Sequence, residues 1–113
     1  MDRIGVQKPH NKRMQEFLRS NGFPYAVVKY MEKGSLQGSW RVYSRPKISV
    51  KDRRNKNILE IYDKWSPEVA DKLNSLGFSN LWGKPLGQFD GNGGLLSVFV
   101  RGRKEFLQEG NNG

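Results

Sequence analysis

The sequence contains no cysteine, a single histidine and no long apolar run. Without cysteine there can be no disulfide framework, zinc ribbon or thiol nucleophile, so packing must stabilise the folded state. No apolar segment approaches the roughly 18 residues of a membrane span, and the opening MDRIGVQKPHNKR lacks the apolar middle of a signal peptide. We therefore expect a cytoplasmic protein, or one in a host-cell compartment that holds nucleic acid. We expect it to be neither secreted nor bound to a membrane.

Acidic residues are scarce in the first half of the chain. Residues 1–57 carry 14 Lys and Arg against 4 Asp and Glu, a net charge of +10, whereas residues 58–113 carry 6 against 7, a net charge of −1. The excess charge of this +9 chain therefore lies wholly in its first half. Such asymmetry points to a polyanionic partner, with nucleic acid as the first candidate. The alternative is a basic protein whose charge only keeps it soluble.

Aromatic residues, by contrast, are plentiful. Three Trp, four Tyr and six Phe in 113 residues indicate one folded domain with an aromatic core. We expect residues 1–10 to form a loose basic arm, residues 11–109 a single domain and residues 110–113 a flexible tail. The three tryptophans, Trp40, Trp65 and Trp82, are expected in the core or at its edge.

Two helices are predicted from their capping residues and apolar spacing. Asn11 as N-cap predicts a short helix over about 12–20. Ser66 as N-cap and Gly77 as the closing residue predict a second helix over 67–76. Phe78, just after Gly77, is expected to pack back onto this helix.

Strand patterns fill much of the remaining chain. Segments 25–32 and 39–45 are rich in aromatic and β-branched residues and are joined by a Gly-containing connection, which predicts a hairpin. Further strands are predicted at 48–50, 58–63 and 95–101. A short closing helix is predicted over 103–109. This order of elements predicts an α+β fold: a single small domain with a mainly antiparallel sheet of about five strands and two or three short helices.

The second strand of the first hairpin alternates in a way that suggests binding. A strand has a period of two, so Trp40 and Val42 share one face, while Arg41, Tyr43 and Arg45 share the other. Proteins that hold single-stranded nucleic acid combine a positive groove for phosphates with rings on which bases stack. The alternative is that Tyr43 covers core and that the arginines extend past it to water.

A basic stretch, RPKISVKDRRNKN, continues from this strand at residues 45–57 with six cations and one acid. Cations at a hairpin tip suit phosphate contact, because each neutralised phosphate releases condensed counterions. The alternative is an ordinary solvated loop. The predicted nucleic-acid-binding residues are Lys29, Arg41, Tyr43, Arg45, Lys47, Lys51, Arg53, Arg54 and Lys56.

Residues suited to catalysis are few. His10 has no carboxylate or nucleophile at an informative spacing, so a Ser-His-Asp triad or a histidine metal site is not indicated. Asp52, Glu60 and Asp63 could converge as a metal-binding acid cluster, although an odd offset places the last two on opposite strand faces. The segment 91–94 matches GxxG, but turn chemistry explains it better. No catalytic residue, metal or cofactor is predicted.

These observations favour a non-catalytic domain that binds nucleic acid, single-stranded DNA or RNA before duplex. Two alternatives stay open: a small metal-independent RNA-cleaving toxin that acts through Arg, Lys and Tyr, and a protein-binding inhibitor or adaptor that acts on an acidic partner. Whether the chain forms a homo-oligomer also stays open.

Overall fold

The computed structural model describes residues 8–44, 63–91 and 94–108. Within these ranges the chain forms two α-helices, three β-strands and one 3-10 helix. In chain order the elements are α1 (Pro9–Ser20), β1 (Ala26–Tyr30), β2 (Trp40–Ser44), α3 (Pro67–Ser75), β3 (Ser97–Val100) and η2 (Lys104–Leu107).

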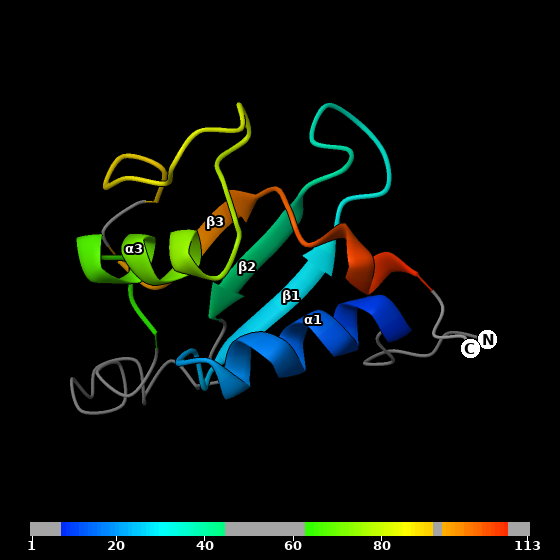
Figure 1. The fold of residues 1–113 in the computed structure, drawn as a ribbon, viewed down its shortest axis with the longest axis horizontal. Helices are drawn as coiled ribbons and strands as arrows, with labels where there is room; N and C mark the ends of the chain where they lie inside the picture. Colours follow the sequence, from blue (N-terminus) through cyan, green and yellow to red (C-terminus); the bar gives the residue numbers. More distant parts are fainter. Residues whose placement is uncertain (1–7, 45–62, 92–93, 109–113) are drawn as a thin grey trace, which may run out of the picture.

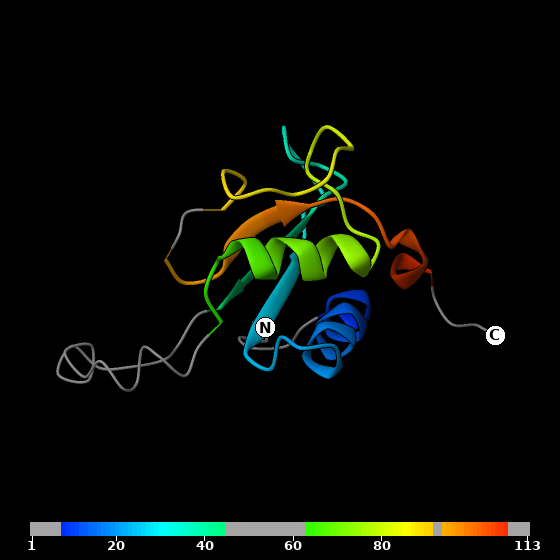
Figure 2. The ribbon, with the colours of Figure 1, turned by 60° about the vertical axis from the view of Figure 1, so that its left-hand side comes forward.

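The three strands form one antiparallel sheet in the order β1-β2-β3. Val42 in the middle of β2 pairs with Val28 of β1 and Val98 of β3, which fixes the register. Both helices lie on the same face of the sheet, with α1 over β1 and α3 on the side of β3 (Figure 1, Figure 2). No described element covers the other face. The fold therefore has two layers and one open sheet face.

The core lies between the helices and the sheet. Alternate residues of each strand face the helices, as the period of two requires. These buried strand residues are Ala26, Val28, Trp40, Val42, Val98 and Val100. Met14 and Leu18 of α1 and Leu73 of α3 belong to the same cluster. Full burial of a large apolar side chain stabilises the folded state by about 1.5–3 kcal/mol, so this layer contributes much of the stability of the domain.

Helix α3 begins and ends as its sequence predicts. The Ser66 hydroxyl accepts the Val69 N–H at 3.2 Å, which satisfies one of the unpaired donors of the first turn. At the other end Gly77 adopts φ +95°, a left-handed conformation that glycine takes without steric cost. The Phe78 N–H then donates to the Leu73 carbonyl at 3.1 Å, and Phe78 is buried in the core.

Helix α1 begins at Pro9, three residues earlier than predicted. Proline suits the first helical position, because its missing N–H would have no helical partner there. Asn11 is therefore not the N-cap; its Oδ1 instead accepts the backbone N–H of Tyr30 at 2.8 Å. His10, expected in a loose arm, lies in the first turn with its ring centroid 5.7 Å from that of Tyr30 and 6.2 Å from that of Trp40.

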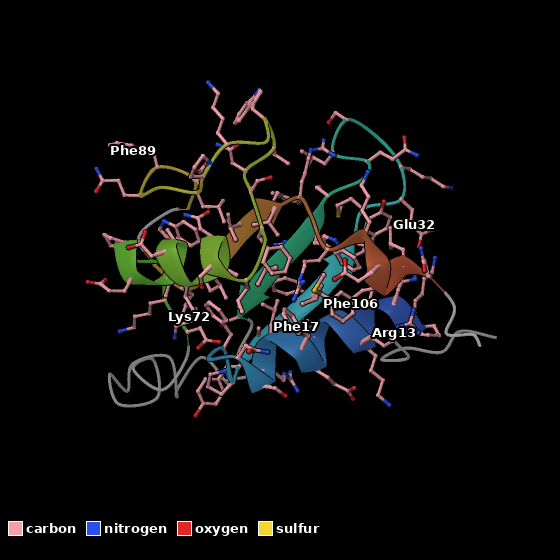
Figure 3. The ribbon with its side chains drawn as sticks, in the orientation of Figure 1. Arg13, Phe17, Glu32, Lys72, Phe89 and Phe106 are labelled. Atoms are coloured by element: carbon pink, nitrogen blue, oxygen red, sulfur yellow. The ribbon has the colours of Figure 1, made fainter. Side chains whose placement is uncertain are left out.

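The C-terminal part of the described chain is fastened to α1. The rings of Phe17 and Phe106 lie 5.1 Å apart between their centroids, and Figure 3 shows them between α1 and η2. Arg13 donates to the carbonyl oxygens of Phe106 and Gln108 at 2.7 and 2.8 Å. Arg13 therefore has a structural role, because it joins α1 to the C-terminal part of the described chain.

The prediction of a small α+β domain with an antiparallel sheet is confirmed. The described sheet has three strands where about five were predicted, so the finer prediction is not confirmed. The strand predicted at 48–50, and all but the last residue of the one at 58–63, lie outside the described residues. The strand predicted at 95–101 is shorter, and the closing helix predicted at 103–109 is the single 3-10 turn η2.

Candidate nucleic-acid interface

The strand residues that point away from the helices share one face of the sheet, on which Lys29 is exposed and the others are partly buried. These six residues, here named the open face, are Val27 and Lys29 of β1, Arg41 and Tyr43 of β2, and Ser97 and Phe99 of β3. None of them is fully buried, whereas the residues between them in the strands are. The sheet thus presents a surface on which a ligand could lie flat.

Two cations sit opposite one another on the open face. Lys29 and Arg41 are direct partners across β1 and β2. Like charges placed directly opposite on neighbouring strands destabilise a sheet. Of the Asp and Glu residues in the described ranges, none lies within 4.0 Å of either side chain. An anion bound at this pair would relieve the repulsion.

Two aromatic rings lie beside these cations. Tyr43 pairs with Ser97 and Phe99 pairs with Arg41, so the two rings are diagonal neighbours on adjacent strands. Such neighbours are about 7–8 Å apart, within reach of aromatic side chains. The guanidinium carbon of Arg41 lies 4.4 Å from the centroid of the Tyr43 ring. The Arg41 guanidinium therefore lies over the Tyr43 ring, with Phe99 on the neighbouring strand of the same face.

The predicted site residues fall into two groups. The structure places Lys29, Arg41 and Tyr43 together on the open face. The remaining six lie outside the described residues: Arg45, Lys47, Lys51, Arg53, Arg54 and Lys56. Their part in binding stays a prediction.

Phe99 is the aromatic member of the open face that was not among the predicted site residues. It lies in the apolar run Leu-Leu-Ser-Val-Phe-Val, where an aromatic residue is readily taken for core. The signal was nevertheless present, because Val98 and Val100 flank it at the period of a strand. If both valines face the core, Phe99 must face the other way.

The three tryptophans divide differently from the prediction. Trp40 and Trp65 are buried in the core, with 0% and 4% of their surface exposed. Trp82 was expected in the core or at its edge, but it is 77% exposed. The reason is local: residues 80–84 form a hydrogen-bonded turn that projects from the connection between α3 and β3.

The histidine lies away from the open face, on the helix side. The His10 Nε2 is 3.9 Å from a carboxylate oxygen of Glu32, which also pairs with Lys8. The hydrogen bond from Lys8 holds the pKa of Glu32 below its usual value of 4.5. This cluster links the start of α1 to the connection after β1.

The acid cluster considered from the sequence is not assembled in the described residues. Asp52 and Glu60 lie outside them, and Asp63 accepts the backbone N–H of Tyr25 at 3.0 Å. Burial raises the pKa of Asp63 above its usual value of 3.8. Within the described ranges no three His, Asp or Glu side chains are grouped closely enough to hold a metal ion.

Comparison with known proteins yields no matching family model, curated protein or solved structure. Neither described helix has the length and apolar character needed to cross a membrane.

Proposed function

We propose that this chain binds single-stranded nucleic acid on the open face of its sheet. The observation that supports the proposal is the pairing of Lys29 with Arg41 beside the rings of Tyr43 and Phe99, on a face that no described element covers. Cations without acidic partners suit phosphates, and rings suit unpaired bases.

The partly exposed rings of Tyr43 and Phe99 favour a single strand over a duplex. A base can stack on Tyr43 or Phe99 only when it is not stacked within a double helix. The alternative, a helix inserted into the major groove, needs a basic helix face. Helix α3 carries Glu68, Asp71 and Lys72, a net charge of −1.

Helix α1 is no better suited to a groove. Of its cations, Arg13 donates to the two carbonyls of the C-terminal segment, and Arg19 donates to the Ala26 carbonyl at 2.9 Å. Lys12 is exposed, with Glu16 one turn further along the helix. The basic groups of α1 therefore serve mainly to hold the domain together.

The proposal assigns two kinds of contact. Lys29 and Arg41 bind phosphates and fix the position of the strand, without reading its sequence. Tyr43 and Phe99 stack two bases, with each stack contributing about 1–3 kcal/mol. The basic stretch 45–57 continues from the end of β2, and we propose that it adds further phosphate contacts.

A matched pair of substitutions at Tyr43 tests the proposal. The binding of a labelled single-stranded oligonucleotide of about 16 nucleotides is followed by fluorescence anisotropy at low salt. Tyr43→Leu removes the ring and should weaken binding by about 5- to 100-fold, because one stacking interaction is lost. Tyr43→Phe keeps the ring and should bind like the wild-type protein.

The same measurements separate the alternatives. Thermal unfolding of each variant shows whether a loss of binding comes from a loss of fold. Cleavage of a labelled RNA strand without added metal would favour the RNA-cleaving toxin. Failure of the wild-type chain to bind any oligonucleotide at low salt, or equal binding by Tyr43→Leu, would refute the proposal.

A further inference from the structure

A tight turn at residues 80–84 holds a tryptophan out into solvent. The Asn80 side chain closes the turn, because its Oδ1 accepts the backbone N–H of Trp82 at 2.9 Å and that of Lys84 at 3.0 Å. Two backbone hydrogen bonds add to these, from Asn80 N–H to the Lys84 carbonyl at 2.8 Å and from Gly83 N–H to the Asn80 carbonyl at 3.0 Å. Gly83 adopts φ +79°, which glycine accommodates without strain.

The turn is also fixed to the rest of the domain. Arg101 Nε donates to the Leu81 carbonyl at 3.0 Å, and the same guanidinium reaches the Gln37 carbonyl at 3.3 Å. On the other side of the turn, Leu86 is buried and exchanges two hydrogen bonds with the Asn74 side chain, at 2.7 and 2.9 Å. A tryptophan held in this way would lose little conformational entropy on binding.

Trp82 stands out by its exposure. It is 77% exposed, although the two other tryptophans are buried in the core. An exposed tryptophan lacks the stabilisation that burial of its ring would contribute, and exposed aromatic side chains are typical of binding surfaces. The fold therefore exposes an aromatic ring that does not belong to the open face.

The surroundings of Trp82 identify the ligand by chemistry. Residues 79–89 contain one lysine, Lys84, and no acid. Arg101 follows Phe99 by two residues, so its side chain leaves the sheet on the same side as Phe99 before it reaches the turn. The Arg101 guanidinium thus links the turn to the chain just after β3, two residues beyond Phe99.

We propose that Trp82 is a second stacking site, which holds an unpaired base of the same single strand that lies on the open face, with Lys84 near a neighbouring phosphate. This inference rests on the proposed function and extends it. A single strand long enough to cover both surfaces would gain one more stacking interaction than a short one. The alternative occupant, an apolar pocket of a protein partner, predicts no dependence on nucleic acid length.

Phe89 supplies a matched control in the same connection. It is 90% exposed and lies in a turn of similar tightness, closed by the Asp90 carboxylate, which accepts the Gly87 N–H at 2.7 Å. Figure 3 shows Phe89 at the outer edge of the molecule, away from the helices. The neighbouring carboxylate repels phosphate, so Phe89 is a poor stacking site although it is equally apolar.

The experiment compares a single strand of about 4 nucleotides with one of about 16, the range of lengths that single-strand-binding domains occupy. Affinity is measured by anisotropy of the labelled strand, and stacking is measured by quenching of tryptophan emission. Because Trp82 is the one exposed tryptophan of three, the quenching reports on it. Trp82→Ala should weaken binding of the long strand by about 5- to 100-fold and leave the short strand unaffected. Phe89→Ala should change neither.

The outcomes distinguish this inference from the proposed function. Absence of binding by the wild-type chain would refute both. Tight binding by the wild-type chain with no change in Trp82→Ala would overturn only the second stacking site. Equal losses in Trp82→Ala and Phe89→Ala, equal losses for both strand lengths, or equal quenching by polyphosphate, which has no bases, would also overturn it. Circular dichroism should show both variants folded, since Trp82 contributes only its backbone N–H to the turn.

Discussion

At the scale of single residues, Asp63 shows how two opposed effects decide a protonation equilibrium. Its carboxylate accepts the Tyr25 N–H at 3.0 Å and lies 3.5 Å from the Ser44 hydroxyl, and both contacts favour the charged form. Burial disfavours the charged form and is the larger effect, so the pKa of Asp63 lies above 3.8. The folded state therefore holds this proton more tightly than the unfolded state does.

This shift predicts the pH dependence of stability at Asp63. Where the folded state binds more protons than the unfolded state, the free energy of unfolding falls as pH rises. Asp63→Asn keeps an acceptor for the Tyr25 N–H but cannot ionise. The variant should therefore gain stability relative to the wild-type protein as pH rises from about 3 to about 7, the window that begins below the ordinary pKa of aspartate.

Urea unfolding of the two proteins across this pH range measures the difference, and the contributions of all other groups cancel in it. A difference that shrinks with rising pH would mean that the hydrogen bonds from Tyr25 and Ser44 outweigh burial. The assignment of the raised pKa would then be wrong.

Residues of the open face differ in how far the sequence could predict them. The alternation Trp-Arg-Val-Tyr predicted which face of the sheet Arg41 and Tyr43 occupy. Successive strand residues point to opposite faces, so both must face away from the core once Trp40 faces it. Trp82 could not be placed in the same way. Its exposure follows from hydrogen bonds of Asn80 to nearby backbone, whereas composition favours burial of a tryptophan.

At the scale of elements, α1 closes the outer edge of the sheet with a row of polar side chains. One side of the edge strand β1 has no neighbouring strand. Without other partners, the backbone groups on that side could pair with another chain. The contacts are Asn11 Oδ1 with the Tyr30 N–H (2.8 Å), Gln15 Oε1 with the Val28 N–H (3.3 Å) and Arg19 Nε with the Ala26 carbonyl (2.9 Å). Four residues of helix rise about 6 Å and two residues of strand about 6.7 Å, so the two spacings nearly match.

Removing the first contact tests this arrangement. Asn11 is 7% exposed, so Asn11→Ala leaves the Tyr30 N–H without its acceptor in a site that water hardly reaches. We expect the free energy of unfolding to fall by about 1–3 kcal/mol, and the Tyr30 amide to exchange hydrogen faster. Lys12→Ala, at the exposed next position of the same helix, should change stability by less than about 0.5 kcal/mol. Equal stability of the two variants would contradict the role of Asn11.

The same contact explains why one helix boundary was predicted and the other was not. The N-cap contact of α3 is local, because the Ser66 hydroxyl accepts the backbone N–H of Val69, three residues further along the chain. A contact of this kind can be predicted from the sequence alone. Asn11 resembles an N-cap in sequence, but its partner is 19 residues away in β1. A tertiary contact of this kind overrides local preference, and no pattern within the helix reveals it.

At the scale of the whole molecule, the positively charged side chains are of two kinds: those that hydrogen-bond to backbone carbonyls and those for which no such bond is seen in the described residues. Arg13, Arg19 and Arg101 donate to backbone carbonyls outside their own elements, so part of the positive charge of the chain holds the fold together. Lys29 and Arg41 have no such partner among the described residues, and six further cations belong to residues 45–57, which lie outside the described ranges. Under the proposed function, the candidates for phosphate contact are the two cations of the sheet and the six of the basic stretch 45–57.

The salt dependence of binding counts how many of these cations take part. For single strands the slope of log K against log salt is about −0.7 per neutralised phosphate, so Lys29 and Arg41 alone give about −1.4 and all eight cations about −5.6. We expect a slope much steeper than −1.4, and we expect Arg53→Glu with Arg54→Glu to flatten it by more than about 1.4 while the thermal midpoint stays unchanged. A slope near −1.4 that the double reversal leaves unaltered would restrict binding to the sheet. Because both slopes come from one titration series, their difference counts the phosphates that the basic stretch neutralises.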